Sequence, residues 1–231
     1  MQKKLISQRL KSPPKTQGGF VLMLMTLIFV LVSASVFISV LSNNNQVDLR
    51  EGSNTTDAMS GIKETLISYS VLYADYYGAA SAGPGHLMCP DTDGDGVEDE
   101  PCATNSLGRL PTSMILPSGD IFPISDYQNG IDQQVWYALS DNFRRNPAML
   151  LNSSSAGNLT LDGQGGIAAI LIAPNEALVA QNRASNASAD YLEAGNIAAP
   201  TFVTNDPLDP NNFNDRLLPI RITEVFTPVT A

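Results

Sequence analysis

The sequence predicts an α+β fold in which a long N-terminal helix packs on a small antiparallel sheet. Three observations predict it. A long uncharged apolar run follows the N-terminal leader, a helical stripe of apolar residues comes next, and short apolar runs bounded by Gly, Pro and Asn fill the rest. A chain of 231 residues has room for one ordinary domain and an extended element. We therefore expect one globular domain over residues 79–231.

The apolar run extends from Phe20 to Ser42, 23 residues without a charge or a proline. As a helix it would be about 35 Å long, which is enough to cross a bilayer core. Residues 1–19 carry five basic and no acidic side chains, a bias that predicts a leader retained in the cytoplasm. The alternative is an ordinary secretory signal, for which Ser33-Ala34-Ser35 offers a cleavage site.

Residues 43–78 are expected to continue the helix as an amphipathic half. Their apolar side chains recur at spacings of three and four, which places on one helical face Met59, Ile62, Leu66, Tyr69, Tyr73 and Tyr76. Gly78 supplies a stop signal. The polar run Asn43 to Gln46 keeps open an alternative, in which the anchor and the amphipathic helix are separate.

Three later runs predict strands, namely Gln134–Ser140, Gly166–Ala173 and Arg216–Phe226. Pro219 lies inside the last of them. Because proline cannot donate to a strand ladder, that run should lie at a sheet edge or begin late.

The stretch KTQGGFVLMLMTLIFVLVSASVF, Lys15 to Phe37, joins the basic leader through two glycines to the apolar run. It resembles the N-terminus of the type IV prepilin family, which includes the pseudopilins of type II secretion. The matching part covers about residues 1–45. The resemblance implies a pilin-like fold, and a prepilin peptidase that cuts after Gly19 and methylates the new amine of Phe20.

The resemblance also implies a location and partners. The chain would sit in the bacterial inner membrane as a single-pass protein, with residues 20–42 as the membrane and assembly helix, the leader cytoplasmic and the globular domain periplasmic. Its partners would be other pilin-like subunits, the prepilin peptidase and the inner-membrane assembly machinery.

Leu24 departs from the family pattern. Most major pilins carry Glu at the fifth mature position, which is Leu24 when counted from Phe20. In the family this Glu meets the terminal amine of a neighbouring subunit, and a subunit at the filament tip lacks that neighbour. An ionisable side chain left without a partner charge there would be costly. Leu24 therefore suits a tip-proximal or priming subunit, although the leucine is also what an ordinary signal anchor would carry.

The acidic stretch CPDTDGDGVEDEPC, Cys89 to Cys102, contains the only two cysteines. On the exported side of a membrane they favour a disulfide, which would stabilise the domain by about 3 kcal/mol. Two free thiols are the alternative.

Within this loop, Asp91, Asp93, Asp95 and the following glycine match the opening of a calcium loop. The Val97 carbonyl and Asp99 would be the next two ligands. Position 12 is Cys102 in place of the usual bidentate Glu, so we expect weak affinity, about 10⁻⁴–10⁻³ M. A solvated acidic turn is the competing interpretation.

Other chemistry has little support. No nucleophile elbow, zinc-protease motif or phosphate loop is present, so we expect no enzyme. Beyond the leader the chain has 8 basic and 23 acidic residues, and this negative charge argues against nucleic-acid binding. His86 is expected to be a loop residue, Arg144 and Arg145 surface charges, and Trp136 part of the core.

The sequence thus predicts a minor pilin or pseudopilin subunit of a type IV pilus or type II secretion-like filament. The alternative is a signal-anchored periplasmic calcium-binding module. An anchored hydrolase is a third, weaker hypothesis.

Overall fold

The computed structural model describes residues 18–78, 83–104, 106–116, 118–124, 134–145, 149–179, 181–209 and 212–226. The leader, residues 1–17, lies outside them. The chain divides into two compact units, Met1–Arg50 and Glu51–Ala231. Helix α1, Gly18–Tyr77, runs through the boundary between them. Only its part from Glu51 onward belongs with the sheet.

The second unit is built around a curled, mixed, six-stranded sheet. Five strands follow the order β1-β4-β6-β5-β7, and the sixth, β8, pairs with β6. Their bounds are Ser106–Arg109 (β1), Trp136–Leu139 (β4), Leu159–Leu161 (β5), Gln164–Ala173 (β6), Thr201–Phe202 (β7) and Arg216–Arg221 (β8). All pairs are antiparallel except β5 with β7.

The other elements are short. A separate two-stranded sheet pairs β2, Ser113–Ile115, with β3, Ile121–Pro123. Three 3₁₀ helices are η3 (Asp141–Phe143), η4 (Ser188–Asp190) and η5 (Ala194–Ile197). The last described element is helix α2, Ile222–Phe226.

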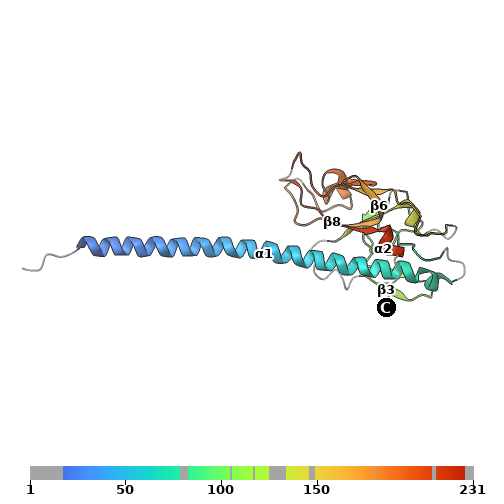
Figure 1. Cartoon of the computed structure of the whole chain (residues 1–231), viewed down its shortest axis with the longest axis horizontal. Coiled ribbons are helices and arrows are strands. Elements are labelled where there is room, and N and C mark those ends of the chain that lie inside the picture. The colour runs from blue at the N-terminus through green and yellow to red at the C-terminus, as the bar shows by residue number, and fades with distance from the viewer. Residues whose placement is uncertain are drawn as a thin grey trace, which may run out of the picture. The chain divides into compact units, whose positions relative to one another are not determined.

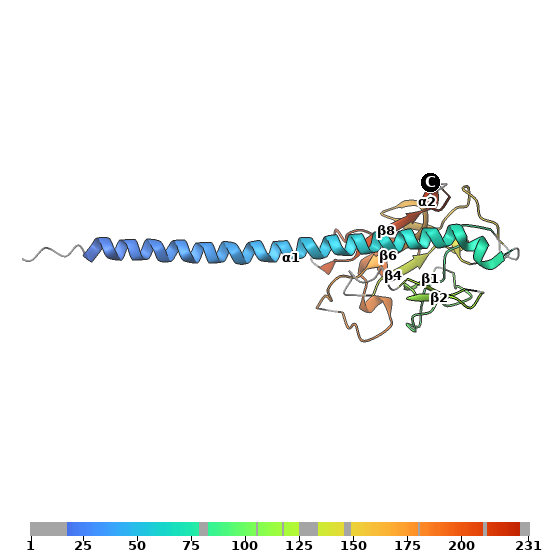
Figure 2. The ribbon, with the colours of Figure 1, turned by 90° about the horizontal axis from the view of Figure 1, so that it is seen from below.

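Alternation along the central strands creates two cores. Because successive strand side chains point to opposite faces, Tyr137 and Leu171 contribute to the core shared with α1, whereas Trp136 and Ile170 contribute to a second core. The first core holds most of the predicted helical stripe, since Met59, Ile62, Leu66, Tyr69 and Tyr73 are buried and Tyr76 is partly buried against them. Figure 2 shows the last turns of α1 lying across β8, β6 and β4. Figure 1 shows the labelled β6 and β8 side by side.

The predicted fold is wrong in its architecture. The sheet is mixed and curled where we expected a small antiparallel one, and much of the remaining described chain is irregular or in short helices. We also expected a pilin-type helix, with a membrane-spanning half, that forms one unit with the sheet. This is wrong as well, because the chain divides into two units after Arg50. The third predicted strand, Arg216–Phe226, is extended only as far as Arg221 and then turns into α2.

The predicted membrane anchor is also overturned. No helix among the described residues is both long enough and apolar enough to cross a bilayer. The membrane role of residues 20–42 and the single-pass inner-membrane location were built on that anchor, so neither has support in the structure.

Candidate functional site

The acidic loop 89–102 is closed by a disulfide between Cys89 and Cys102, with 5.3 Å between their Cα atoms. This confirms the predicted pairing, and neither of the two cysteines is free. Cys89 is fully buried, so the loop is fixed at its root against the core.

Backbone contacts hold the loop against β1. Asp91 and Arg109 exchange two hydrogen bonds, Asp91 N to Arg109 O at 2.9 Å and Arg109 N to Asp91 O at 2.6 Å. Gly108 permits this close approach, because a Cβ there would lie 2.4 Å from the Asp91 carbonyl oxygen. The amide of Thr112 donates to the Gly96 carbonyl at 3.0 Å and fastens the middle of the loop.

Asp91 organises the loop from its interior. It is fully buried, and its Oδ1 and Oδ2 accept hydrogen bonds from the amides of Gly94 (2.6 Å) and Gly96 (2.8 Å). Both glycines have positive φ, 84° and 89°, a conformation that other residues rarely adopt. The turn that the sequence pattern requires is therefore present.

The carboxylates of Asp91, Asp93 and Asp99 converge, with one oxygen from each within 4.8 Å of the others. Asp99 accepts hydrogen bonds from the Thr92 hydroxyl and from the Thr92 amide (2.6 Å), and these bonds lower the pKa of Asp99. These hydrogen bonds therefore favour the ionised form of Asp99. Three convergent carboxylates are ligands that a hard cation prefers, so this group could hold a metal ion.

Two of the predicted ligands are not brought into this group. Asp95 lies outside it, and its Oδ1 accepts a hydrogen bond from the Val97 amide at 2.8 Å. The role predicted for the Val97 carbonyl stays a prediction. A second acidic group combines Cys89, Glu98 and Glu100, but the sulfur of Cys89 is committed to the disulfide.

Arg145 is the residue that sequence analysis missed. Its guanidinium pairs with Glu98 at 2.7 Å and with Glu100 at 2.6 Å, and its side chain is mostly buried. Burial raises the pKa of Glu98, and the charge of Arg145 only partly offsets the effect. The expectation that Arg145 is a surface charge is wrong, because its mostly buried side chain binds Glu98 and Glu100 in the second half of the loop.

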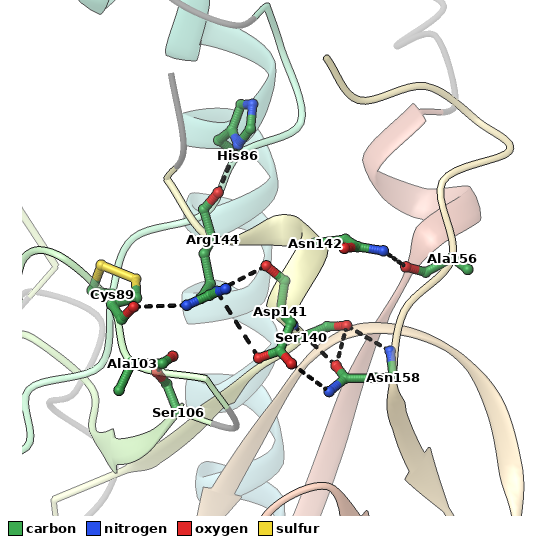
Figure 3. A network of polar contacts seen from close by, with 11 residues as sticks. His86, Cys89, Ala103, Ser106, Ser140, Asp141, Asn142, Arg144, Ala156 and Asn158 are labelled. Carbon is green, nitrogen blue, oxygen red and sulfur yellow. Dashed lines mark hydrogen bonds and ion pairs between the residues drawn. A yellow bond between two sulfur atoms is a disulfide. The ribbon is translucent and has the colours of Figure 1, made fainter. Parts of the chain in front are cut away.

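Arg144 links the disulfide to the neighbouring segments, as Figure 3 shows. Its Nη1 donates to the Cys102 carbonyl at 2.7 Å and its Nε donates to the Asp141 carbonyl at 2.9 Å. The Arg144 carbonyl in turn lies 2.8 Å from Nδ1 of His86.

His86 is a buried loop residue with no part in either acidic group. Its second ring nitrogen lies 3.1 Å from the Met149 carbonyl, and its ring packs on Tyr73 at 4.9 Å. Burial lowers the pKa of His86. Its surroundings are those of a packed core histidine.

The predicted processing residues, Gly19 and Phe20, lie in the first turn of α1. A little further along this helix, all the apolar side chains that the structure describes are exposed: Met23, Leu24, Met25, Leu27, Ile28 and Val30. We call these six residues the exposed apolar segment. Leu24, the departure from the family pattern, is 48% exposed.

Comparisons with protein-family models, with curated proteins and with solved structures gave no match. The resemblance of the N-terminus to the prepilin family therefore stays a prediction, and the membrane and pilin descriptions drawn from it gain no support from relatives.

Proposed function

We propose that this chain is a minor subunit of a filament of the pilin or pseudopilin class, in which its α1 helix packs against helices of neighbouring subunits. The observation that carries the proposal is the exposed apolar segment. A soluble helix normally turns its apolar side chains toward its own core. Here Met23, Leu27 and Val30 are each more than half exposed, at 72%, 57% and 61%.

Burial of this segment against other subunits would supply the energy for assembly. Fully burying one large apolar side chain is worth about 1.5–3 kcal/mol. Six such side chains can therefore hold a subunit in a bundle of similar helices. The leader pattern adds a processing step, in which a prepilin peptidase removes residues 1–19 and leaves Phe20 as the new terminus. Other pilin-like subunits and an assembly machinery would be the remaining partners.

Leu24 supports a role near the tip or in the priming complex. With leucine at the fifth mature position the subunit cannot offer the carboxylate that would meet a neighbour's amine. A subunit at the tip has no need of that contact. The protein should accordingly be scarce in filaments, and its loss should impair initiation more than length.

Mass spectrometry of the mature N-terminus tests the proposal first. N-methylated Phe20 is expected, and a bulky residue in place of Gly19 should leave the precursor uncut. An intact chain in cells that contain the peptidase would refute the proposal.

Assembly itself is tested with Leu27→Glu in the exposed apolar segment. Because Leu27 is 57% exposed, the charge should leave folding intact while it reduces incorporation into filaments at least tenfold. Leu208→Glu, at a position that is 94% exposed in the other unit, is the matched control. Equal incorporation of the two variants would contradict packing through α1.

A second candidate function is favoured by the convergence of Asp91, Asp93 and Asp99, namely calcium binding that rigidifies the acidic loop. Three carboxylates and no bidentate Glu fit the weak range of about 10⁻⁴–10⁻³ M. Magnesium should bind less well, because it demands a tighter octahedron and dehydrates reluctantly.

Thermal melts of the full chain with calcium, magnesium and chelator test this function. Calcium at about ten times Kd should add about 1.4 kcal/mol of stability. Asp93→Asn should abolish the shift, whereas Asp95→Asn, outside the convergent group, should retain most of it. Coincident melts at millimolar metal, or equal loss in both variants, would leave the loop a charged turn.

A further inference from the structure

Two carboxyl groups, of Glu193 and Asp215, are buried together close to the start of β8. Their residues are only 8% and 5% exposed. Glu193 precedes η5, and Asp215 immediately precedes β8. The pair therefore joins the segment 181–203, which contains η4, η5 and β7, to the start of an edge strand.

Glu193 is held by three hydrogen-bond donors. Its Oε2 accepts hydrogen bonds from the backbone amides of Asn214 (3.1 Å) and Asp215 (3.0 Å). Its Oε1 accepts a hydrogen bond from the side-chain amide of Gln181. These three donors fix the Glu193 carboxyl group in place.

Asp215 has a different environment. Its Oδ2 accepts hydrogen bonds from the Glu193 amide at 3.0 Å and from Asn196 Nδ2 at 2.9 Å. Its Oδ1 is buried and accepts no hydrogen bond from a donor among the described residues. A buried oxygen without a donor is costly if it is charged, and costs far less if it carries a proton.

Two basic residues are related to the pair by sequence or by a shared partner. Arg216 follows Asp215 directly, and Arg183 bonds to Gln181, which donates to Glu193. Arg183 also bonds to backbone carbonyls. Glu193 is the titratable group that bonds to Asp215, so two negative charges would share one buried site if both carboxyl groups were ionised.

We propose that Asp215 is a neutral carboxylic acid in the folded protein, whose proton is shared with Glu193 and latches the segment 181–203 to the start of β8. Burial raises the pKa of Asp215 to about 8, and the charge of Glu193 and the hydrogen bond to it add to the rise. The bonds from the Glu193 amide and Asn196 act in the opposite direction without cancelling the effect.

The sign of the pH dependence follows from linkage. The folded state holds a proton that the unfolded chain releases near its ordinary pKa of 3.8. The stabilisation is therefore complete below about pH 4, falls as pH rises, and is lost once pH passes about 8.

The test compares urea unfolding of the full chain with that of Asp215→Asn between pH 5 and 9, in detergent to cover the exposed apolar segment. Asparagine places an NH₂ group where the protonated oxygen stood, so it should mimic the latched state at every pH. Relative to this variant, the folded-to-unfolded ratio of the wild type should fall by up to tenfold per pH unit from pH 5 to 7. The difference should level off above about pH 8.

Two further variants locate the proton. Glu193→Gln should destabilise the fold at every pH, because its NH₂ would face hydrogen-bond donors. Asp162→Asn, which alters an exposed carboxylate that binds Thr204, should keep the wild-type profile. Parallel profiles of the wild type and Asp215→Asn would overturn the proposal, as would a flat profile in Glu193→Gln alone.

Infrared spectroscopy keeps the proposal falsifiable if Asp215→Asn does not fold. Wild-type protein with ¹³C-labelled aspartate should show the C=O band of a protonated carboxyl group at pH 7, and the band should vanish above about pH 8. Absence of that band at pH 7 would refute a neutral Asp215.

Discussion

The guanidinium carbon of Arg145 lies 4.1 Å from the centre of the Tyr77 ring, at the C-terminal end of α1. The same guanidinium binds Glu98 and Glu100 of the acidic loop. One side chain therefore ties the disulfide-closed loop to the end of the long helix. A metal ion bound by Asp91, Asp93 and Asp99 would share the loop with these two ion pairs, because Asp99 lies between Glu98 and Glu100 in the sequence.

Replacement of Arg145 by Met should destabilise the fold by about 3 kcal/mol, because it leaves Glu98 buried without its partner. The free energy of urea unfolding at pH 7 measures the loss. Arg221→Met removes an exposed arginine from β8 and is the control, with an expected loss below about 1 kcal/mol. Equal small losses in both variants would show that the Arg145 pair is only a surface contact.

Gly108→Ala should cost about 1–3 kcal/mol, because the new Cβ would lie 2.4 Å from the Asp91 carbonyl oxygen and force the loop away from β1. Gly165→Ala is the matched control in β6, where a Cβ would meet nothing within 4 Å. Thermal melts of both variants check the contrast. Gly108→Ala should also weaken any calcium shift, since Asp91 is displaced with its backbone. A melt of Gly108→Ala that matches Gly165→Ala would contradict the close approach.

Leu66→Ala should lower the free energy of unfolding by about 2–5 kcal/mol, because Leu66 is fully buried between α1 and the sheet. Leu72→Ala, on the outer side of the same helix and 40% exposed, should cost much less. Chemical denaturation of both variants measures the difference. Similar costs would mean that α1 does not bury its predicted stripe.

Local patterns in the sequence predicted local features well. The three-four spacing from Met59 to Tyr73 identified the buried face of α1, because that spacing is the helical repeat itself. Of the predicted strands, Gln134–Ser140 contains β4, and Gly166–Ala173 lies within β6 but misses its first two residues. Pro219 correctly indicated an edge, since β8 pairs with β6 alone in the described sheet.

Long-range features could not be predicted. Glu98 and Arg145 are 47 residues apart, and no spacing rule connects them. The parallel pair β5 and β7 comprises strands of three and two residues, too short to show any alternation. One missed signal was local. The Arg221 amide donates to Glu224 Oε2 at 2.7 Å, an interaction across three residues that resembles half of a capping box and marks the start of α2.

Removal of the disulfide by Cys89→Ser with Cys102→Ser should cost about 3 kcal/mol, because the unfolded chain regains the entropy of an open loop. The folded loop should keep its conformation, because Glu98 would still accept a hydrogen bond from the backbone amide of residue 89 and would still pair with Arg145. The variant should therefore lose stability without losing its calcium response. The melting temperature should drop, while the calcium shift of the surviving folded protein should persist at a higher calcium concentration.

Wild-type protein melted with a reductant is the control, and it should match the double variant. Complete loss of the calcium shift in a double variant that remains folded would show that the disulfide, rather than the contacts of Arg145 and Arg109, holds Asp91, Asp93 and Asp99 together.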